Sequence, residues 1–174
     1  MYKKVIQFPN PILRSKTQKV KDYSAIENII KDLIDTCNVE MAAGIAANQI
    51  GYKKSIVVID KSKIGTEINL LGNEKNPKFL VLINPELELS GEDKRWKEEC
   101  LSLSGGVGYV TRKEKAKLTY NNEKGEKIVC DTEWPFSGVL QHECDHLEGI
   151  TFNFRMSRFA ASRMIKKLKK KGKK

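Results

Sequence analysis

Residues 141–146 read Gln-His-Glu-Cys-Asp-His and contain both histidines of the chain, four positions apart. On a helix, side chains at this spacing share one face, so His142 and His146 can bind one metal ion while Glu143 stays free to move a proton. Pro135 and the apolar residues after it are typical of the start of a half-buried helix. The motif predicts a metal-binding helix suited to metal-assisted hydrolysis. Two solvated surface histidines are the alternative.

A catalytic metal site of this kind needs a third protein ligand and an open position for water. Cys144 is the nearest thiol, but it lies about 200° round the helix from His142 and should point away from the metal. Cys100 is the other candidate, because it precedes the glycine-rich segment 104–108, where the backbone can turn sharply. A lone cysteine is commonly a small buried hydrophobe, so Cys100 is a hypothesis at this point.

The small apolar segment 44–51, Gly-Ile-Ala-Ala-Asn-Gln-Ile-Gly, carries the amide side chain of Gln49. Alone, the segment is also compatible with an ordinary tight entry to a helix. Taken in order, the patterns G-x-A-A-x-Q, E-x-C-L-S and Q-H-E-x-x-H resemble the three signature motifs of peptide deformylases. Similarity in residues 8–14, 82–86 and 145–149 extends this resemblance over nearly the whole chain.

The resemblance implies one metal ion held by Cys100, His142 and His146, with water in the fourth position. One thiolate with two imidazoles suits several first-row metals. The family implies Fe(2+), with Zn(2+), Ni(2+) and Co(2+) as alternatives. We expect Glu98 and Asp145 to orient the histidines from outside the ligand set.

The implied reaction removes the formyl group from N-formylmethionyl nascent peptides and releases formate. By resemblance, Glu143 takes a proton from water and returns it to the leaving amine. The Gln49 amide and the Leu101 backbone N–H are expected to stabilise the oxyanion. The predicted substrate-binding residues are Gly44, Ile45 and Val139, with Leu140 beside them.

Four positions depart from the usual family pattern. Ala42, Glu99, Ser104 and Val107 stand where Gly, Gly, Pro and Arg are common in the family. None of these departures removes a predicted ligand, the base or the glutamine. They alter the loop that lines the peptide groove, so they bear on efficiency and substrate preference rather than on the reaction class.

Two other functional classes share part of this pattern. A metallopeptidase would share H-E-x-x-H but would take Glu or His as its third ligand, and the chain has no third histidine. A divergent, low-activity paralogue with a mainly metal- and ribosome-binding role would keep the ligands but could lose Glu143, which is present. Release of formate from a formylated peptide distinguishes the three.

The length of 174 residues allows a single domain with a substantial core. There is no run of about 18 apolar residues and no apolar N-terminal signal region, which predicts a cytoplasmic protein without a membrane segment. The four cysteines are scattered and do not suggest a disulfide framework. We expect a monomer.

The C-terminus is strongly basic. Eight basic residues and no acidic residue lie in positions 163–174, and they supply most of the formal net charge of +10. We therefore predict a deformylase-like catalytic domain in residues 1–162 and a basic tail in 163–174, at the end of the last helix. Such a tail can contact phosphates. Because the resembled substrate exists only at the start of newly made proteins, the resemblance implies docking on the ribosome or rRNA. A solvated, frayed helix end is the alternative.

The predicted fold class is α+β, with antiparallel and mixed β-strands packed around the central metal-binding helix. Apolar residues at helical spacing predict an N-terminal helix after Ser24. A basic C-terminal helix is expected to begin at Ser157 and to bury Ala161, Met164, Ile165 and Leu168. Strands are predicted at 55–59 and 79–83, a hairpin at 117–120 and 127–130, and an exposed loop at 61–78.

Overall fold

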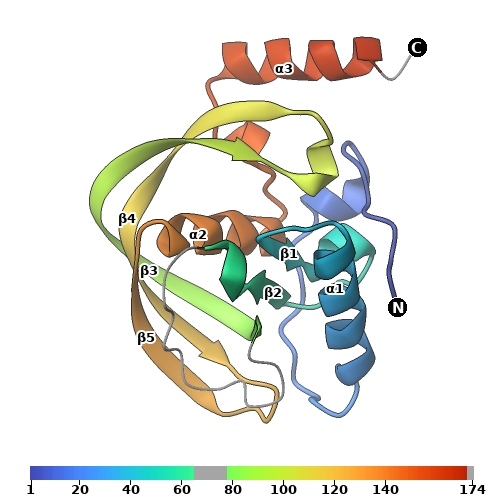
Figure 1. Ribbon diagram of the computed structural model, residues 1–174, viewed down its shortest axis with the longest axis vertical. Coiled ribbons are helices and arrows are strands. Elements are labelled where there is room, and N and C mark those ends of the chain that lie inside the picture. Colours follow the sequence, from blue (N-terminus) through green and yellow to red (C-terminus); the bar gives the residue numbers. More distant parts are fainter. Residues whose placement is uncertain (65–77, 172–174) are drawn as a thin grey trace.

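The computed structural model describes residues 1–64 and 78–171, with a central helix enclosed by strands (Figure 1). Within these residues, no helix is long and apolar enough to cross a membrane. The elements follow in this order: η1 (Pro11–Arg14), α1 (Glu27–Val39), β1 (Gly44–Ala46), η2 (Ala47–Ile50), β2 (Ile56–Asp60), η3 (Lys61–Lys63), β3 (Phe79–Glu99), η4 (Leu101–Leu103), β4 (Val107–Asn121), β5 (Lys127–Glu133), α2 (Phe136–Leu147), η5 (Phe152–Phe154) and α3 (Arg158–Lys171).

The five strands form one sheet in the order β1-β2-β3-β4-β5, and every neighbouring pair is antiparallel. Among the described residues, parallel pairing is limited to an isolated bridge between Gln18 and Lys54. The α+β prediction is confirmed. The predicted loop at 61–78 begins with the short helix η3, and most of it lies outside the described residues.

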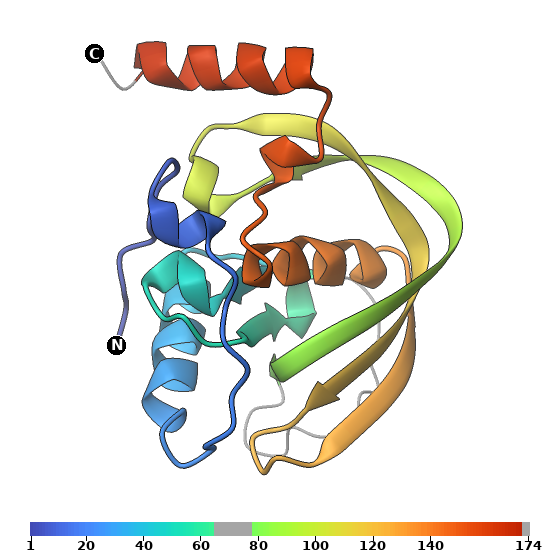
Figure 2. The same ribbon diagram turned by 180° about the vertical axis from the view of Figure 1, so that it is seen from behind.

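Helices cover both faces of strand β2, which is buried along its whole length. Ile56 and Val58 pack in the cluster that contains the apolar residues of α1, whereas Val57 and Ile59 pack in the cluster that contains those of α2. This alternation follows from the two-residue period of a strand. Figure 2 shows α2 crossing the centre of the molecule, with α1 at its side. The α1 helix, which begins at Glu27, confirms the prediction of a helix after Ser24.

Strands β3 and β4 are much longer than predicted and form a curved pair. The predicted strands 79–83 and 117–120 lie inside them, and the hairpin with β5 is confirmed. The β3–β4 register shifts between Ile83 and Glu86 and again between Ser90 and Asp93, and such shifts bend a strand pair. The pair therefore curves around α2 (Figure 1) and brings the chain from the sheet back toward that helix.

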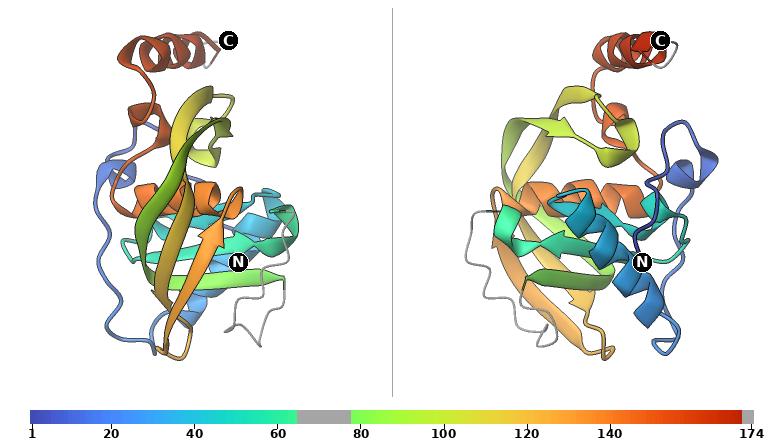
Figure 3. Two further views of the ribbon diagram at one scale, coloured as in Figure 1. Left: turned by 90° about the vertical axis from the view of Figure 1, so that its left-hand side faces the viewer. Right: turned by 45° about the vertical axis from the view of Figure 1, so that its right-hand side comes forward.

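Helix α3 lies beyond the end of the β3–β4 pair (Figure 3). The predicted start is confirmed, because the Ser157 hydroxyl accepts a hydrogen bond of 3.3 Å from the Ala160 N–H. Met164 is buried, and Ile165 and Leu168 pack beside it. The predicted boundary between residues 162 and 163 falls inside this helix.

Candidate functional site

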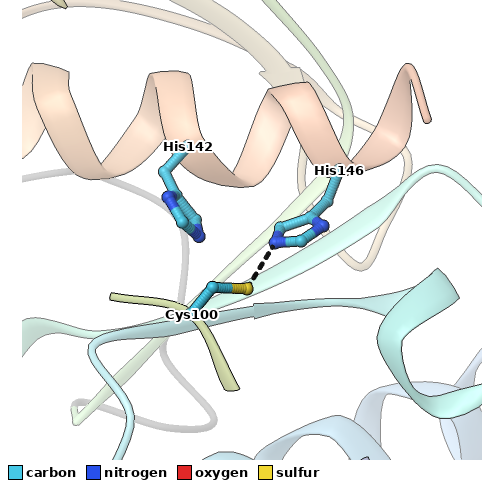
Figure 4. Close-up of side chains that lie close together, drawn as sticks. All are labelled: Cys100, His142 and His146. Atoms are coloured by element: carbon cyan, nitrogen blue, oxygen red, sulfur yellow. Dashed lines mark hydrogen bonds between the residues drawn. The ribbon is translucent and has the colours of Figure 1, made fainter. Parts of the chain in front are cut away.

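The two histidines and Cys100 lie together, as the sequence predicted. Helix α2 presents His142 and His146 one turn apart, and Cys100 follows directly after the end of β3 (Figure 4). Their ligand atoms lie within 4.8 Å of one another, and Cys100 Sγ is 3.2 Å from His146 Nε2. Cys144 is outside this group, which agrees with its predicted position on another face of the helix.

The chemistry of the donor set fits a divalent metal ion. The Glu98 carboxylate accepts a hydrogen bond of 2.8 Å from His142 Nδ1, which leaves Nε2 of that ring available to the group. Tetrahedral coordination at ordinary metal–sulfur and metal–nitrogen lengths would separate the two donor atoms by about 3.6 Å, and the observed Cys100–His146 separation of 3.2 Å is close to this value. The hydrogen bond between His142 Nδ1 and Glu98 agrees with the prediction that Glu98 orients a histidine.

The electrostatics of the group favour a thiolate at Cys100. Burial raises the pKa of the Cys100 thiol, but attraction to His146 and hydrogen bonding with His142 outweigh it and lower the pKa to about 5. For His142, burial lowers the pKa, whereas Cys100 and Glu98 raise it more, so its pKa lies above the usual value. A thiolate is the form of cysteine that binds metals.

Glu143 stands beside the group without belonging to it. The residue is only 4% exposed, and its Oε2 atom has no hydrogen-bond partner among the described residues. Burial raises the pKa of its carboxyl, and the opposing effect of His142 and His146 is smaller. A buried carboxylate with a raised pKa is suited to accepting and returning a proton.

A cleft of about 540 Å³ opens onto these side chains. It is bounded by segments that are far apart in the sequence: the N-terminal segment, β1, η2, the end of β3 and α2. The predicted site residues that line it are Gly44, Gln49, Cys100, Leu101, Val139, His142 and Glu143.

Gln49 is held in one orientation. Its Oε1 atom accepts a hydrogen bond of 2.8 Å from the Ala46 N–H, so its amide nitrogen must point the other way, where it lies 3.7 Å from Cys100 Sγ and 3.2 Å from Ser102 Oγ. Leu101 is the first residue of η4, and the first N–H groups of a helix have no acceptor within it. The Gln49 amide nitrogen and the N–H of Leu101, which directly follows Cys100, are therefore two donors near the Cys-His-His group.

Three predicted residues lie elsewhere. Ile45 is fully buried in the cluster beneath α1, and Leu140 is fully buried against the sheet, so neither side chain lines the cleft. Among the described residues, Asp145 forms no hydrogen bond with a histidine ring; it accepts hydrogen bonds from Arg112 and Arg155. Its effect on the histidines is indirect.

Sequence reasoning missed the buried side chain of Arg112. Its guanidinium donates to both oxygens of Glu98, at 2.9 and 3.1 Å, and also to Asp145. These hydrogen bonds and that from His142 overcome burial and lower the pKa of the Glu98 carboxyl to about 2. The alternation of β4 held a signal, since Arg112 has the same parity as Val110 and Ala116, which face inward.

Two further residues support the site. The Asn48 amide donates to the backbone oxygen of His146. Gln7 donates to Leu101 O at 2.9 Å and accepts from Ser104 N at 3.3 Å, which ties the N-terminal segment to the loop after Cys100. Asn48 lies in segment 44–51, where Gln49 was the only amide predicted to act in the site, and nothing in the sequence surroundings of Gln7 distinguishes it from an ordinary surface residue.

The four departures from the family pattern are spread over the cleft and its surroundings. Ala42, Glu99 and Ser104 line the cleft, whereas Val107 lines a separate groove beside α3. The Glu99 side chain is 67% exposed and lies 3.5 Å from Lys97. These positions leave the ligand group, Glu143 and Gln49 in place.

Comparison with known proteins agrees with this arrangement. Residues 2–162 match the family described as polypeptide deformylase. The chain is 38% identical over 172 residues to a peptide deformylase of Aquifex aeolicus, covering 98% of this chain and 96% of the relative. Peptide deformylase 3 of Shewanella oneidensis is 35% identical over 167 residues, covering 95% and 96%.

Solved structures show the same fold. A peptide deformylase from Legionella pneumophila superposes with a TM-score of 0.86 at 28% identity, covering 99% of this chain and 96% of that one. A peptide deformylase from Synechococcus elongatus, solved in complex with actinonin, superposes with a TM-score of 0.80 at 26% identity, covering 94% and 84%. Neither the metallopeptidase nor the paralogue alternative gains support. The chain belongs to the peptide deformylase family of metal-dependent enzymes.

Proposed function

We propose that this protein removes the formyl group from the N-terminal N-formylmethionine of newly synthesised proteins and releases formate. The observation that carries the proposal is the position of Glu143: a buried carboxylate that is not a ligand, beside a Cys-His-His group, at the floor of an open cleft.

Cys100, His142 and His146 would hold the metal ion in this proposal. When bound, the ion would act as a Lewis acid on the formyl oxygen and lower the pKa of a water molecule. Glu98 fixes the ring orientation of His142 through Nδ1, and Arg112 in turn fixes Glu98.

Glu143 would accept the proton of the attacking water on its free carboxylate oxygen and later deliver it to the nitrogen of the leaving amine. The Gln49 Nε2–H and the Leu101 N–H would donate to the formyl oxygen as negative charge develops on it. Each such donor lowers the barrier by about 3 kcal/mol. The fixed Gln49 oxygen supports this role, because the amide cannot turn its acceptor toward the cleft.

For the metal we propose Fe(2+), on the strength of the family resemblance, with Zn(2+), Ni(2+) and Co(2+) as the alternatives that the donor set accepts. We propose a cytoplasmic monomer that works on nascent chains. Gly44 and Val139 are the proposed substrate-binding residues, and both line the cleft.

We also propose that the basic C-terminal tail contacts the ribosome or its RNA. The described lysines of α3 support this, because Lys166, Lys167, Lys169 and Lys170 are exposed. The groove between α3 and the β3–β4 pair is also lined by cations, two of them from α3 itself. Its basic residues are Arg95, Arg155, Arg163 and Lys167.

Formate release from formyl-Met-Ala-Ser by anaerobically purified protein tests the proposed reaction. We expect stoichiometric formation of formate and free Met-Ala-Ser, with metal content near one ion per chain by elemental analysis. Cleavage of a peptide bond without formate would instead indicate a peptidase. If no product of either kind formed, hydrolase activity on this peptide would be rejected. Actinonin, which was bound in the Synechococcus elongatus structure, is expected to inhibit the reaction.

A further inference from the structure

The turn formed by Ser104, Gly105 and Gly106 is part of the wall of the cleft. It closes the loop that begins with Cys100 and Leu101, and the Gly106 N–H donates to Leu103 O at 2.7 Å. Gly105 has a φ of +74°, in the region that favours glycine. Two successive glycines have wide backbone freedom, so contacts from outside must hold this turn in place.

Helix α3 supplies those contacts from the side opposite the cleft. A β-carbon on Gly106 would lie 3.3 Å from both Met164 Sδ and Leu168 Cδ1. A β-carbon on Gly105 would lie 3.9 Å from Leu168 Cδ2. Gly105 lines both the cleft and the groove beside α3. The wall between the substrate cleft and α3 is therefore a single layer of backbone.

The same apolar cluster reaches the proposed metal ligand. Met164 is 9% exposed and packs with Cys100 and Leu103, and Leu168 packs against this cluster. Because packed interiors transmit displacement, the position of α3 on this cluster and the position of the loop from Cys100 to Gly106 are mechanically linked. Figure 3 shows α3 running alongside the end of the β3–β4 pair where this loop lies.

We propose that Met164 and Leu168 are positioning residues for substrate binding, acting through the Gly105–Gly106 turn. In this view α3 is part of the catalytic unit and not an independent tail. The inference rests on the proposed deformylation, and it concerns the peptide-binding wall rather than the reacting atoms. A truncation after Ser162 would remove both side chains, so it would disturb the cleft together with any docking of the basic face.

The test compares the double variant Met164→Ala/Leu168→Ala with Lys169→Ala, which changes an exposed residue of the same helix. For formyl-Met-Ala-Ser, we expect the double variant to raise KM about tenfold while kcat stays within about twofold. Metal content should be unchanged. The single variant Leu168→Met keeps the apolar volume at the turn, so its KM should stay close to that of the wild type.

Amide hydrogen exchange gives a readout that does not depend on activity. The double variant should accelerate exchange of the Leu103–Gly106 amides about tenfold and leave those of α1 unchanged. Unchanged exchange and unchanged KM would overturn the inference. So would faster exchange throughout the chain with parallel losses of kcat and metal, because that pattern indicates a general structural role. If the wild type released no formate, the proposed reaction would fall, and exchange at the turn would still decide the positioning claim.

Discussion

The α-carbon of Gly44 lies directly against the carboxylate of Glu143. A β-carbon at position 44 would sit 2.9 Å from Glu143 Oε1 and 2.9 Å from Ile59 Cδ1. Gly44 pairs with Ile59 in the β1–β2 ladder, so its backbone cannot retreat without breaking the sheet. The absence of a side chain at Gly44 is therefore what gives the Glu143 carboxylate its place in the cleft.

Gly44→Ala is expected to lower kcat about a hundredfold, because the methyl group would displace the Glu143 carboxylate by a fraction of an ångström or more. Steady-state formate release measures this. The metal content serves as the internal control and should stay at the wild-type level, since Gly44 lies outside the ligand group. Wild-type turnover in a well-folded Gly44→Ala variant would refute the close packing.

Cys100→Ala is expected to abolish stoichiometric metal binding, because it removes the one thiolate of the group. Cys144→Ala is the matched control, a cysteine of α2 outside the group, and should keep nearly all of the metal. Elemental analysis after anaerobic purification gives both values. The reverse order of metal loss would show that the wrong cysteine has been assigned.

Arg112→Ala is expected to destabilise the fold by about 3–5 kcal/mol, because it removes the buried guanidinium that forms ion pairs with the buried carboxylates of Glu98 and Asp145. Urea unfolding of the protein measures the loss. Arg155→Ala is the control: Arg155 also pairs with Asp145, but its side chain is 45% exposed, and the expected cost is about 1 kcal/mol or less. If both variants lost the same free energy of unfolding, burial would not explain a larger contribution of Arg112 to stability.

Much of the site was predictable because it depends on short-range geometry. The four-residue spacing of His142 and His146 fixes a shared helix face, and the two-residue offset of Cys144 excludes it from that face. Both predictions needed nothing beyond the pitch of an α-helix. Cys100 was different, since its place beside α2 depends on the path of the whole β3–β4 pair. The glycine-rich segment after it made it a candidate, and only the family resemblance made it a predicted ligand.

The longer-range features could not be read from local patterns. Residues 84–99 carry only a short polar–apolar alternation at 86–89, and positions 88–93 are all exposed, because this part of β3 leaves the core. Arg112 was missed for a different reason: β4 alternates, but the inward parity of Arg112 is visible only once β4 is known to start at Val107. Ile45 shows the opposite error: its motif lies at the cleft, but the strand turns its side chain into the core.

Charge reversal on the outer face of α3 tests ribosome docking without disturbing the apolar face. The variant Lys166→Glu/Lys169→Glu/Lys170→Glu should lose cosedimentation with ribosomes at low salt and keep its activity on formyl-Met-Ala-Ser. Binding of the wild type should fall steeply with salt, with a log–log slope of several units. The control variant alters the net charge by the same amount but at exposed lysines outside α3: Lys21→Glu, Lys31→Glu and Lys53→Glu.

If the two triple variants lost ribosome binding to the same degree, net charge alone would account for it. Salt-insensitive recovery of all three proteins would reject docking by α3.

The most direct test of the proposed mechanism is a paired measurement of metal content and formate release in Glu143→Ala and Glu143→Gln. Glu143 is not a member of the ligand group, so both variants should bind metal at the wild-type stoichiometry. Without the proton carrier, formate release should fall by about a thousandfold or more. Near-wild-type turnover in either metal-loaded variant would contradict the assignment of Glu143 as the base.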